Sequence, residues 1–190
     1  MELFTQIKPI VVIIHAFAGA IGIGATTVTD TLFFKFLADL KISSGEKKIM
    51  DTLSQVLWVA LGFLIVTGVL LFLSDPARYG ASPKFLVKMV IVGIITLNGL
   101  LLNYIIAPRM ESLRFDTPDE ARRLSSFKRI AFISGVVSLT SWYASFLLGL
   151  LVHIPLTFWQ GIAVYLGFLL VGGILSQIVY RLFVKKSLQK

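Results

Sequence analysis

Residues 9–36 read PIVVIIHAFAGAIGIGATTVTDTLFFKF, and this stretch decides the class of the protein. Between Pro9 and Lys35 its ionisable side chains are those of His15 and Asp30, and the other residues are apolar, small or threonine. A helix needs about 20 predominantly apolar residues to cross the hydrocarbon core of a bilayer. The stretch therefore predicts a membrane-spanning helix with an imidazole near one end and a carboxylate near the other.

The remaining chain repeats this pattern. Of its 190 residues, 56% are hydrophobic and 15% are charged, and the mean hydropathy is +0.87. Soluble domains are about 45–50% apolar, so this composition favours an integral membrane protein. We predict an all-α fold, a single transmembrane domain over residues 1–190. Its five-helix bundle would use helices at about 9–36, 52–73, 84–107, 127–151 and 158–183.

Three positions outside the apolar runs carry signals for where helices begin or end. The N-terminus has no basic region or clean cleavage site, so it is interpreted as part of the first helix rather than as a signal peptide. Pro108 is expected to end the third helix. Between the third and fourth helices, Thr117 as N-cap and Pro118 at the first position predict a short separate helix.

Positive charge indicates the orientation. Fourteen of the 18 Lys and Arg residues fall in segments 35–48, 109–129 and 181–190, on one side of the predicted bundle, and four fall on the other side. We therefore predict a multi-pass protein of the cell (cytoplasmic) membrane. The positive-inside rule places its N-terminus outside the cell and its C-terminus in the cytoplasm. We interpret the net charge of +8 as this topology signal, so we expect the lipid bilayer rather than nucleic acid as partner.

The absence of cysteine narrows the chemistry. Without Cys, the chain can form no disulfide, thiolate metal site or iron–sulfur cluster. The two histidines, His15 and His153, are the only imidazoles, and His153 falls in the predicted outer loop. A site built on imidazole therefore has at most two from one chain.

The first helix separates into two faces at 100° per residue. One face should point into the bundle, and the other should meet lipid. The inward face holds His15, Gly19, Gly22, Thr26, Thr29, Asp30 and Phe33, and the outward face holds Ile13, Phe17, Ile21 and Val28. Small residues on the inward face suit either close helix packing or a flat ligand, and the spacing leaves both interpretations open.

A serine stripe marks the fourth helix. Ser134, Ser138, Ser141 and Ser145 follow one another at steps of four, three and four residues, which is one helix face. Serine hydroxyls can bond back to their own helix, so the stripe fits either packing or a polar cavity wall. A polar path would also include Asn98, Asn103 and Gln177.

The third helix repeats a spacing of the first. Lys88 and Asn103 are fifteen residues apart, as are His15 and Asp30. If the two parallel helices are neighbours, His15 should lie near Lys88 and Asp30 near Asn103. Ionisable groups inside a membrane usually mark functional sites. The alternatives are a Lys88 side chain that reaches the surface, an Asp30 at the interface and a His15 bonded structurally.

The motifs "HAFAGAIGIG" and "KFLVKMVIVGIITLNGLLLNYIIAPRM" resemble the first and third helices of the copper-resistance D-type membrane proteins and the related HemJ-type protoporphyrinogen oxidases. The resemblance covers about the first 110 residues. It departs from the family where no Trp, Tyr or Arg follows His15 before Asp30. It implies a shared architecture and a heme b site, but no specific substrate.

A heme-binding hypothesis builds on this resemblance and assigns particular roles. His15 would be the metal-binding axial ligand of heme b, with His153 as an alternative second ligand. Gly19 and Gly22 would give the ring room. Lys88 would pair with a propionate, act as a base or ligate the iron.

In the heme hypothesis, the candidate catalytic residues are Lys88, Asp30 and Asn103, with the last two as a proton-handling pair. Three functions follow as hypotheses: a heme-dependent membrane oxidoreductase, a small transporter or channel with a polar path around Asp30 and the helix-four serines, and an accessory membrane subunit. The corresponding partners are heme or another hydrophobic small molecule, a second copy of the chain, or a membrane partner protein.

Overall fold

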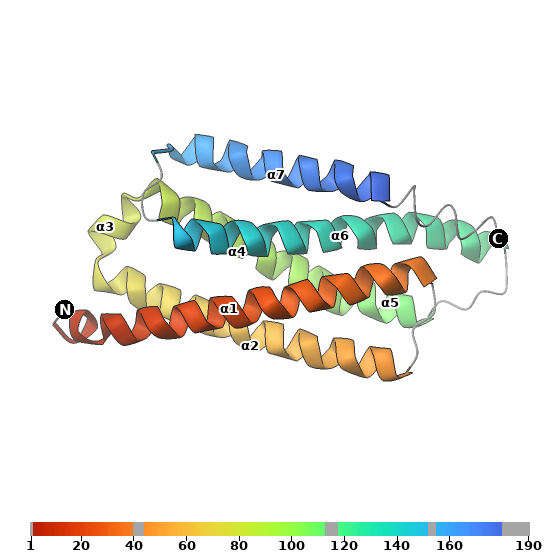
Figure 1. The fold of residues 1–190 in the computed structure, drawn as a ribbon, viewed down its shortest axis with the longest axis horizontal. Coiled ribbons are helices and arrows are strands. Elements are labelled where there is room, and N and C mark those ends of the chain that lie inside the picture. Colours follow the sequence, from red (N-terminus) through yellow and green to blue (C-terminus); the bar gives the residue numbers. More distant parts are fainter. Residues whose placement is uncertain (1, 40–43, 113–117, 152–154, 180–190) are drawn as a thin grey trace.

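A computed structural model describes residues 2–39, 44–112, 118–151 and 155–179. Helices and their connections account for all of these residues (Figure 1). The elements in chain order are α1 (Glu2–Asp39), α2 (Ser44–Ser74), α3 (Pro76–Gly80), α4 (Pro83–Leu101), the π-helical turn η1 (Leu102–Ile106), α5 (Ala107–Ser112), α6 (Pro118–Leu150) and α7 (Phe158–Val179).

Five segments are long and apolar enough to cross a membrane, which confirms the predicted number of spanning helices. They match the five predicted runs in order. Their bounds are Gln6–Lys35, Gly45–Ser74, Pro83–Arg109, Ile130–Leu150 and Phe158–Leu175.

The helices extend beyond several of the predicted bounds. Helix α1 begins before Pro9, which lies inside it. The helix predicted to start at Pro118 does start there, but it continues without interruption as α6. The prediction of a separate short helix is therefore wrong. Residues 119–134 contain neither Gly nor Pro, so nothing in the backbone interrupts the helix where the hydropathy changes.

Pro108 does not end the third helix, in contrast to the prediction. The chain winds as a π-helical turn over Leu102–Ile106 and then continues as α5, which contains Pro108. A proline ring inside a regular helix clashes with the carbonyl four residues earlier, here that of Tyr104. The wider turn accommodates this, and the Ala107 N–H bonds the Leu102 carbonyl five residues back.

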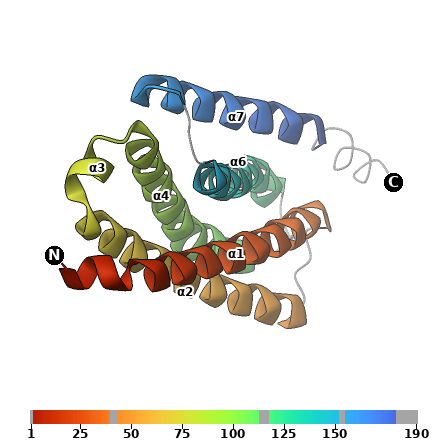
Figure 2. The same ribbon diagram turned by 60° about the vertical axis from the view of Figure 1, so that its left-hand side comes forward.

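Helix α6 occupies the middle of the bundle. It contacts α1 on one side and α4 and α7 on the other, while α1 packs along α2 (Figures 1 and 2). Helix α7 lies on the far side of α6 from α1 (Figure 2). We call the end with α3 the α3 end and the opposite end the α5 end.

Two apolar clusters hold these helices together. The larger one joins α2, α4, α6 and α7 through Leu61, Val87, Ile91, Ile95, Trp142 and Tyr165. The smaller one joins α1, η1 and α6 near the α5 end through Phe33, Ile106, Ala131 and Phe132. Outside these clusters, large apolar side chains point away from the bundle, as the lipid-facing surface of a membrane protein requires.

The two predicted faces of α1 are confirmed. Ile13 and Phe17 are 56% and 67% exposed, whereas Thr26 is 0% and Asp30 is 4% exposed. Seven polar or charged residues besides Asp30 are buried in the described bundle, four of them the α6 serines. The bundle interior is therefore partly polar, and this interior holds the candidate site.

Candidate functional site

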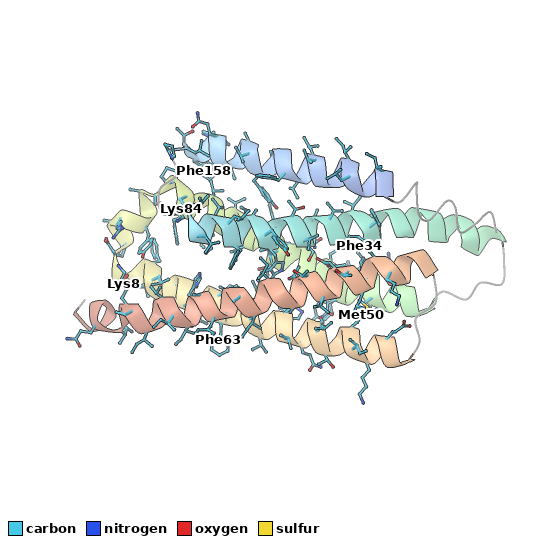
Figure 3. The ribbon with its side chains drawn as sticks, in the orientation of Figure 1. Lys8, Phe34, Met50, Phe63, Lys84 and Phe158 are labelled. Carbon is cyan, nitrogen blue, oxygen red and sulfur yellow. The ribbon has the colours of Figure 1, made fainter. Side chains whose placement is uncertain are left out.

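A cavity of about 140 Å³ lies among α1, α2, the α4–η1 segment and α6. Its polar lining includes Asp30, Ser54, Asn103 and Ser138. The apolar parts of its wall include Trp58, Trp142, Phe33, Leu57, Leu61 and Ile95. Lys47 and Asp51 also line it, and both are exposed near the start of α2, so they mark the mouth of the cavity. Met50, labelled in Figure 3, lies between them in sequence and places this mouth toward the α5 end.

Asp30 is the buried carboxyl group of this cavity. Its side chain is 4% exposed and lines the cavity together with Ser138 of α6. The second oxygen, Oδ2, is buried without a hydrogen-bond partner among the described residues. A buried carboxylate without compensation is costly, so this oxygen requires a proton, a cation or a donor from a ligand or water.

Thr26 repeats this feature one turn away. It lies four residues before Asp30 on the same face of α1, and it is 0% exposed. Its Oγ1 is also buried with no partner in the described part of the chain. Two adjacent turns of α1 therefore each carry a buried polar atom whose hydrogen bonding is incomplete.

Asn103 closes the opposite wall. The Ser54 hydroxyl of α2 donates to the Asn103 Oδ1 atom at 3.1 Å. Asn103 belongs to the π-helical turn, so the local widening caused by Pro108 sets where its amide lies. Asp30 and Asn103 thus share one cavity, as their depths predicted, although α1 and α4 are not closely packed within the described bundle.

The α3 end holds the other predicted pair. His15 Nε2 and Lys88 Nζ are 3.3 Å apart, and His15 Nδ1 and Thr67 Oγ1 are 2.8 Å apart. The Thr67 hydroxyl donates its hydrogen to the Phe63 carbonyl at 2.5 Å, so it must accept from the Nδ1–H of His15. Nε2 is then the acceptor for the Lys88 ammonium. This contact confirms the expectation that His15 and Lys88 lie together.

Two glycines leave room for this pair. A Cβ at Gly68 of α2 would lie 3.9 Å from the His15 ring, and one at Gly149 of α6 would lie 3.7 Å from Lys88 Nζ. Both side chains are partly buried. Lys88 therefore does not simply extend to the membrane surface; its ammonium is held against α1 and α6.

The serine stripe points inward along its whole length. Ser134, Ser138, Ser141 and Ser145 are all at most 9% exposed. Ser141 bonds back to the Val137 carbonyl at 2.5 Å and contacts the Tyr165 hydroxyl at 2.7 Å, so it serves packing. Ser138 instead lines the cavity that also holds Asp30. The stripe therefore combines both interpretations.

Ser134 forms a closed pair with Asn98 of α4. The Ser134 hydroxyl donates to Asn98 Oδ1 at 2.7 Å, and Asn98 Nδ2 donates to the Ser134 carbonyl at 3.0 Å. These bonds tie α4 to α6 and occupy the amide. Asn98 is not among the residues that line the cavity, and neither is Gln177 of α7.

The glycines of α1 accommodate side chains from other helices. A Cβ at Gly22 would lie 2.3 Å from the Trp142 ring, so the indole of α6 fills the space beside this glycine. Gly19 faces Leu64 of α2 at 3.9 Å. Of the two interpretations of the small residues, close helix packing applies to Gly22. The ring that packs against it, that of Trp142, also lines the cavity.

The described arrangement shows no open position for a heme b group at His15. Both nitrogens of His15 already have partners, Thr67 and Lys88. The space beside Gly22 holds an indole, and the 140 Å³ cavity is lined by neither His15 nor Gly19. For a metal ion without a porphyrin, no three His, Asp or Glu side chains are grouped among the described residues. His153 lies outside the described residues.

Sequence reasoning missed four contributors to these sites: Trp58, Trp142, Ser54 and Thr67. A signal was present for the tryptophans, because Trp58 and Trp142 each follow a cavity serine, Ser54 and Ser138, by four residues, the spacing of one helix face. Thr67 had no comparable signal.

Comparisons with known protein families, curated proteins and solved structures found no match to this chain.

Proposed function

We propose that this protein is a small membrane transport protein that moves a cation, with Asp30 as the binding site inside the bundle. The observation that carries the proposal is the Asp30 carboxyl group, 4% exposed on the cavity wall with Oδ2 lacking a hydrogen-bond partner among the described residues. Ionisable groups buried in membrane helices commonly mark ion pathways, because their burial is otherwise unfavourable.

The surroundings of Asp30 support a path with one closed end. Toward the α5 end the cavity reaches the exposed residues Lys47 and Asp51. In the other direction, Leu61, Ile95 and Trp142 belong to both the cavity wall and the larger apolar cluster, so this cluster separates Asp30 from the α3 end. The His15–Lys88 pair lies beyond, about 22 Å along α1 from Asp30 at 1.5 Å per residue.

The Lys88 ammonium gives the α3 end its own role in this proposal. A fixed positive charge repels a passing cation, and its pairing with His15 Nε2 holds it inside the bundle. We infer that this pair forms a barrier at the α3 end. Movement of the Lys88 side chain away from His15 would then be required for release on that side.

The charge distribution sets the direction of the path. The concentration of Lys and Arg in segments 35–48, 109–129 and 181–190 supports an α5 end on the cytoplasmic side of a cell membrane. The cavity would then open toward the cytoplasm, with α3 outside.

The test is cation flux in liposomes that contain the purified protein. Separate gradients of H⁺, Na⁺, K⁺, methylammonium and tetramethylammonium are imposed, and flux is compared with that of protein-free liposomes. Flux of at least one cation should exceed the background, and Asp30→Asn, which keeps the shape but removes the charge, should lower it at least tenfold. Asp75→Asn is the matched control, because Asp75 caps α3 and Asn caps a helix equally well. Absence of flux for every cation, or equal flux in Asp30→Asn, would overturn the proposal.

A further inference from the structure

We propose that the cavity at Asp30 binds a small organic monocation, an alkylated ammonium of about five to seven non-hydrogen atoms. This inference rests on the proposed function and names its substrate class. It depends on three properties of the cavity, which are its size, its charge and its aromatic wall.

The size excludes large ligands. The cavity measures about 140 Å³. An engineered cavity of about 150 Å³ in another protein holds benzene, a molecule of six carbon atoms. Most pockets for drug-sized molecules measure about 300–1,000 Å³, so such molecules do not fit here. A compact ligand such as tetramethylammonium matches the volume.

The charge of the lining favours one positive charge. Among the described residues of the lining, the ionisable ones are Asp30, Asp51 and Lys47. Lys47 and Asp51 are one helical turn apart at the exposed mouth and carry opposite charges, which sum to zero. Asp30 is the deep, unbalanced group, so an ionised Asp30 leaves the cavity with a net charge of −1 that a monocation neutralises.

The wall favours an alkylated cation over a metal ion. Trp58, Trp142, Leu57, Leu61 and Ile95 present ring and alkyl surface, which suits methyl or methylene groups. A tryptophan ring is the strongest partner for a cation–π contact, and two of the chain's three tryptophans line this cavity.

Hydrogen bonds fix the hydroxyls of Ser54 and Thr29 on the cavity wall, because Ser54 donates to Asn103 Oδ1 and Thr29 donates to the Ala25 carbonyl. Beside these hydroxyls, the deep part of the lining presents two indole rings and the Asp30 carboxyl group. This combination of aromatic rings and one carboxylate suits an alkylated ammonium.

Both indoles face glycines of opposing helices. Trp142 of α6 lies against Gly22 of α1, where a Cβ would approach its ring to 2.3 Å, so the ring occupies space that only glycine leaves. Trp58 of α2 faces Gly99 of α4, where a Cβ would make ordinary van der Waals contact at 3.5 Å. Rings fixed before the ligand arrives lose less side-chain entropy on binding. Gly22 thus contributes to the site by positioning the Trp142 part of its aromatic wall.

The experiment uses the fluorescence of these two rings. Trp159 on α7 is 76% exposed, and Trp159→Phe leaves Trp58 and Trp142 as the only tryptophans. The detergent-purified Trp159→Phe protein is titrated with tetramethylammonium chloride, with sodium chloride at matched ionic strength as one control. The neutral analogue tert-butanol, which has the same number of non-hydrogen atoms, is the second control.

We expect a saturable emission change with tetramethylammonium alone, and at least tenfold weaker binding in Asp30→Asn. At position 58, affinity should fall in the order Trp, Phe, Leu, by severalfold at each step, with Trp142 as the remaining reporter. Size-exclusion chromatography and circular dichroism check that each variant is folded. The position-58 series tests the inference even if Asp30→Asn does not fold.

Three results would overturn the inference: no saturation, an equal response to tert-butanol, which would indicate a neutral apolar ligand, or equal affinity in the Phe and Leu variants. If Asp30-dependent flux of another cation persists in liposomes, only the organic-cation inference fails. If no cation moves, the proposed function fails as well.

Discussion

At the scale of single residues, the contact between Gly22 and Trp142 shows how one missing side chain shapes the interior. The indole of α6 lies where a Cβ on Gly22 would be 2.3 Å from the ring, well inside van der Waals contact. The ring is rigid and part of the larger apolar cluster, so it cannot move aside without loss of packing. Gly24, two residues later on the same helix, has no atom within 4 Å of its Cβ position.

These two glycines give a matched prediction. Gly22→Ala should destabilise the protein by about 1–3 kcal/mol, because overpacking forces the indole or the α1–α6 spacing to change. Gly24→Ala adds the same methyl group toward open space and should leave the stability nearly unchanged. The measurement is the melting temperature in detergent, followed by size-exclusion chromatography. Equal melting temperatures for the two variants would contradict the packing described for Trp142.

His15 provides a second test at the same scale. Because Thr67 and Lys88 occupy its two nitrogens, purified protein supplemented with heme should develop no Soret band that depends on His15. The measurement is an absorption spectrum of the protein and of His15→Ala after removal of free heme. A band present in the first and lost in the second would show that the imidazole leaves its partners to bind iron.

At the scale of helices, the Asn98–Ser134 pair illustrates a structural use of polar groups. Two reciprocal hydrogen bonds at 2.7 and 3.0 Å join α4 to α6, and both residues are buried. In a bilayer there is no hydrophobic force between helices, so close packing and such bonds supply the attraction.

A double-mutant cycle measures this bond. Asn98→Ala and Ser134→Ala should be coupled by about 0.6 kcal/mol and at most about 1.7 kcal/mol, the range of interhelical hydrogen bonds in membranes. The measurement is the free energy of unfolding in detergent for both single variants and the double variant. A control cycle of Asn98→Ala with Ser145→Ala, three turns along α6, should be additive. Coupling in the control cycle and none in the first would contradict the pairing.

The helices also show which parts of the fold were predictable from the sequence. Five apolar runs of sufficient length predicted five spanning helices, because backbone polar groups in lipid must be satisfied within a helix. Helix ends were predicted less well. Pro108 suggested an end, yet a π-helical turn accommodates it. The fourth helix was predicted to begin near Phe127, because hydropathy changes there. Hydropathy reports the environment of a helix, however, and not whether the helical backbone continues through the change.

At the scale of the whole molecule, side chains connect helices that are not in close backbone contact. Helix α1 packs on α2 and α6, and α4 packs on α6 and α7. The repeated spacing of fifteen residues nevertheless predicted that His15 meets Lys88 and that Asp30 and Asn103 share a depth, and the structure agrees. Long side chains span the gap. The aromatic wall could not be predicted in the same way, because it depends on which helices face each other across the cavity.

The orientation in the membrane can be tested by labelling introduced cysteines. The chain has no native cysteine that would also be labelled. Single cysteines at Ala77 in α3 and at Gly45 near the start of α2 lie at opposite ends, and both positions are exposed. In intact cells, a membrane-impermeant maleimide should label Ala77→Cys and not Gly45→Cys, as the Lys and Arg distribution predicts. Labelling should be reversed in inside-out vesicles. The opposite pattern would place the cavity mouth outside the cell.

The fit of Trp142 beside Gly22 has a consequence for redesign. The same indole acts as a spacer between α1 and α6 and as part of the cavity wall, so the volume available to a ligand and the distance between these helices are set by one group of atoms. Replacing the indole with a smaller side chain would let the helices approach each other and consume the space gained. A larger binding site would therefore require a new spacer elsewhere along α1 and α6, in addition to a smaller residue at position 142.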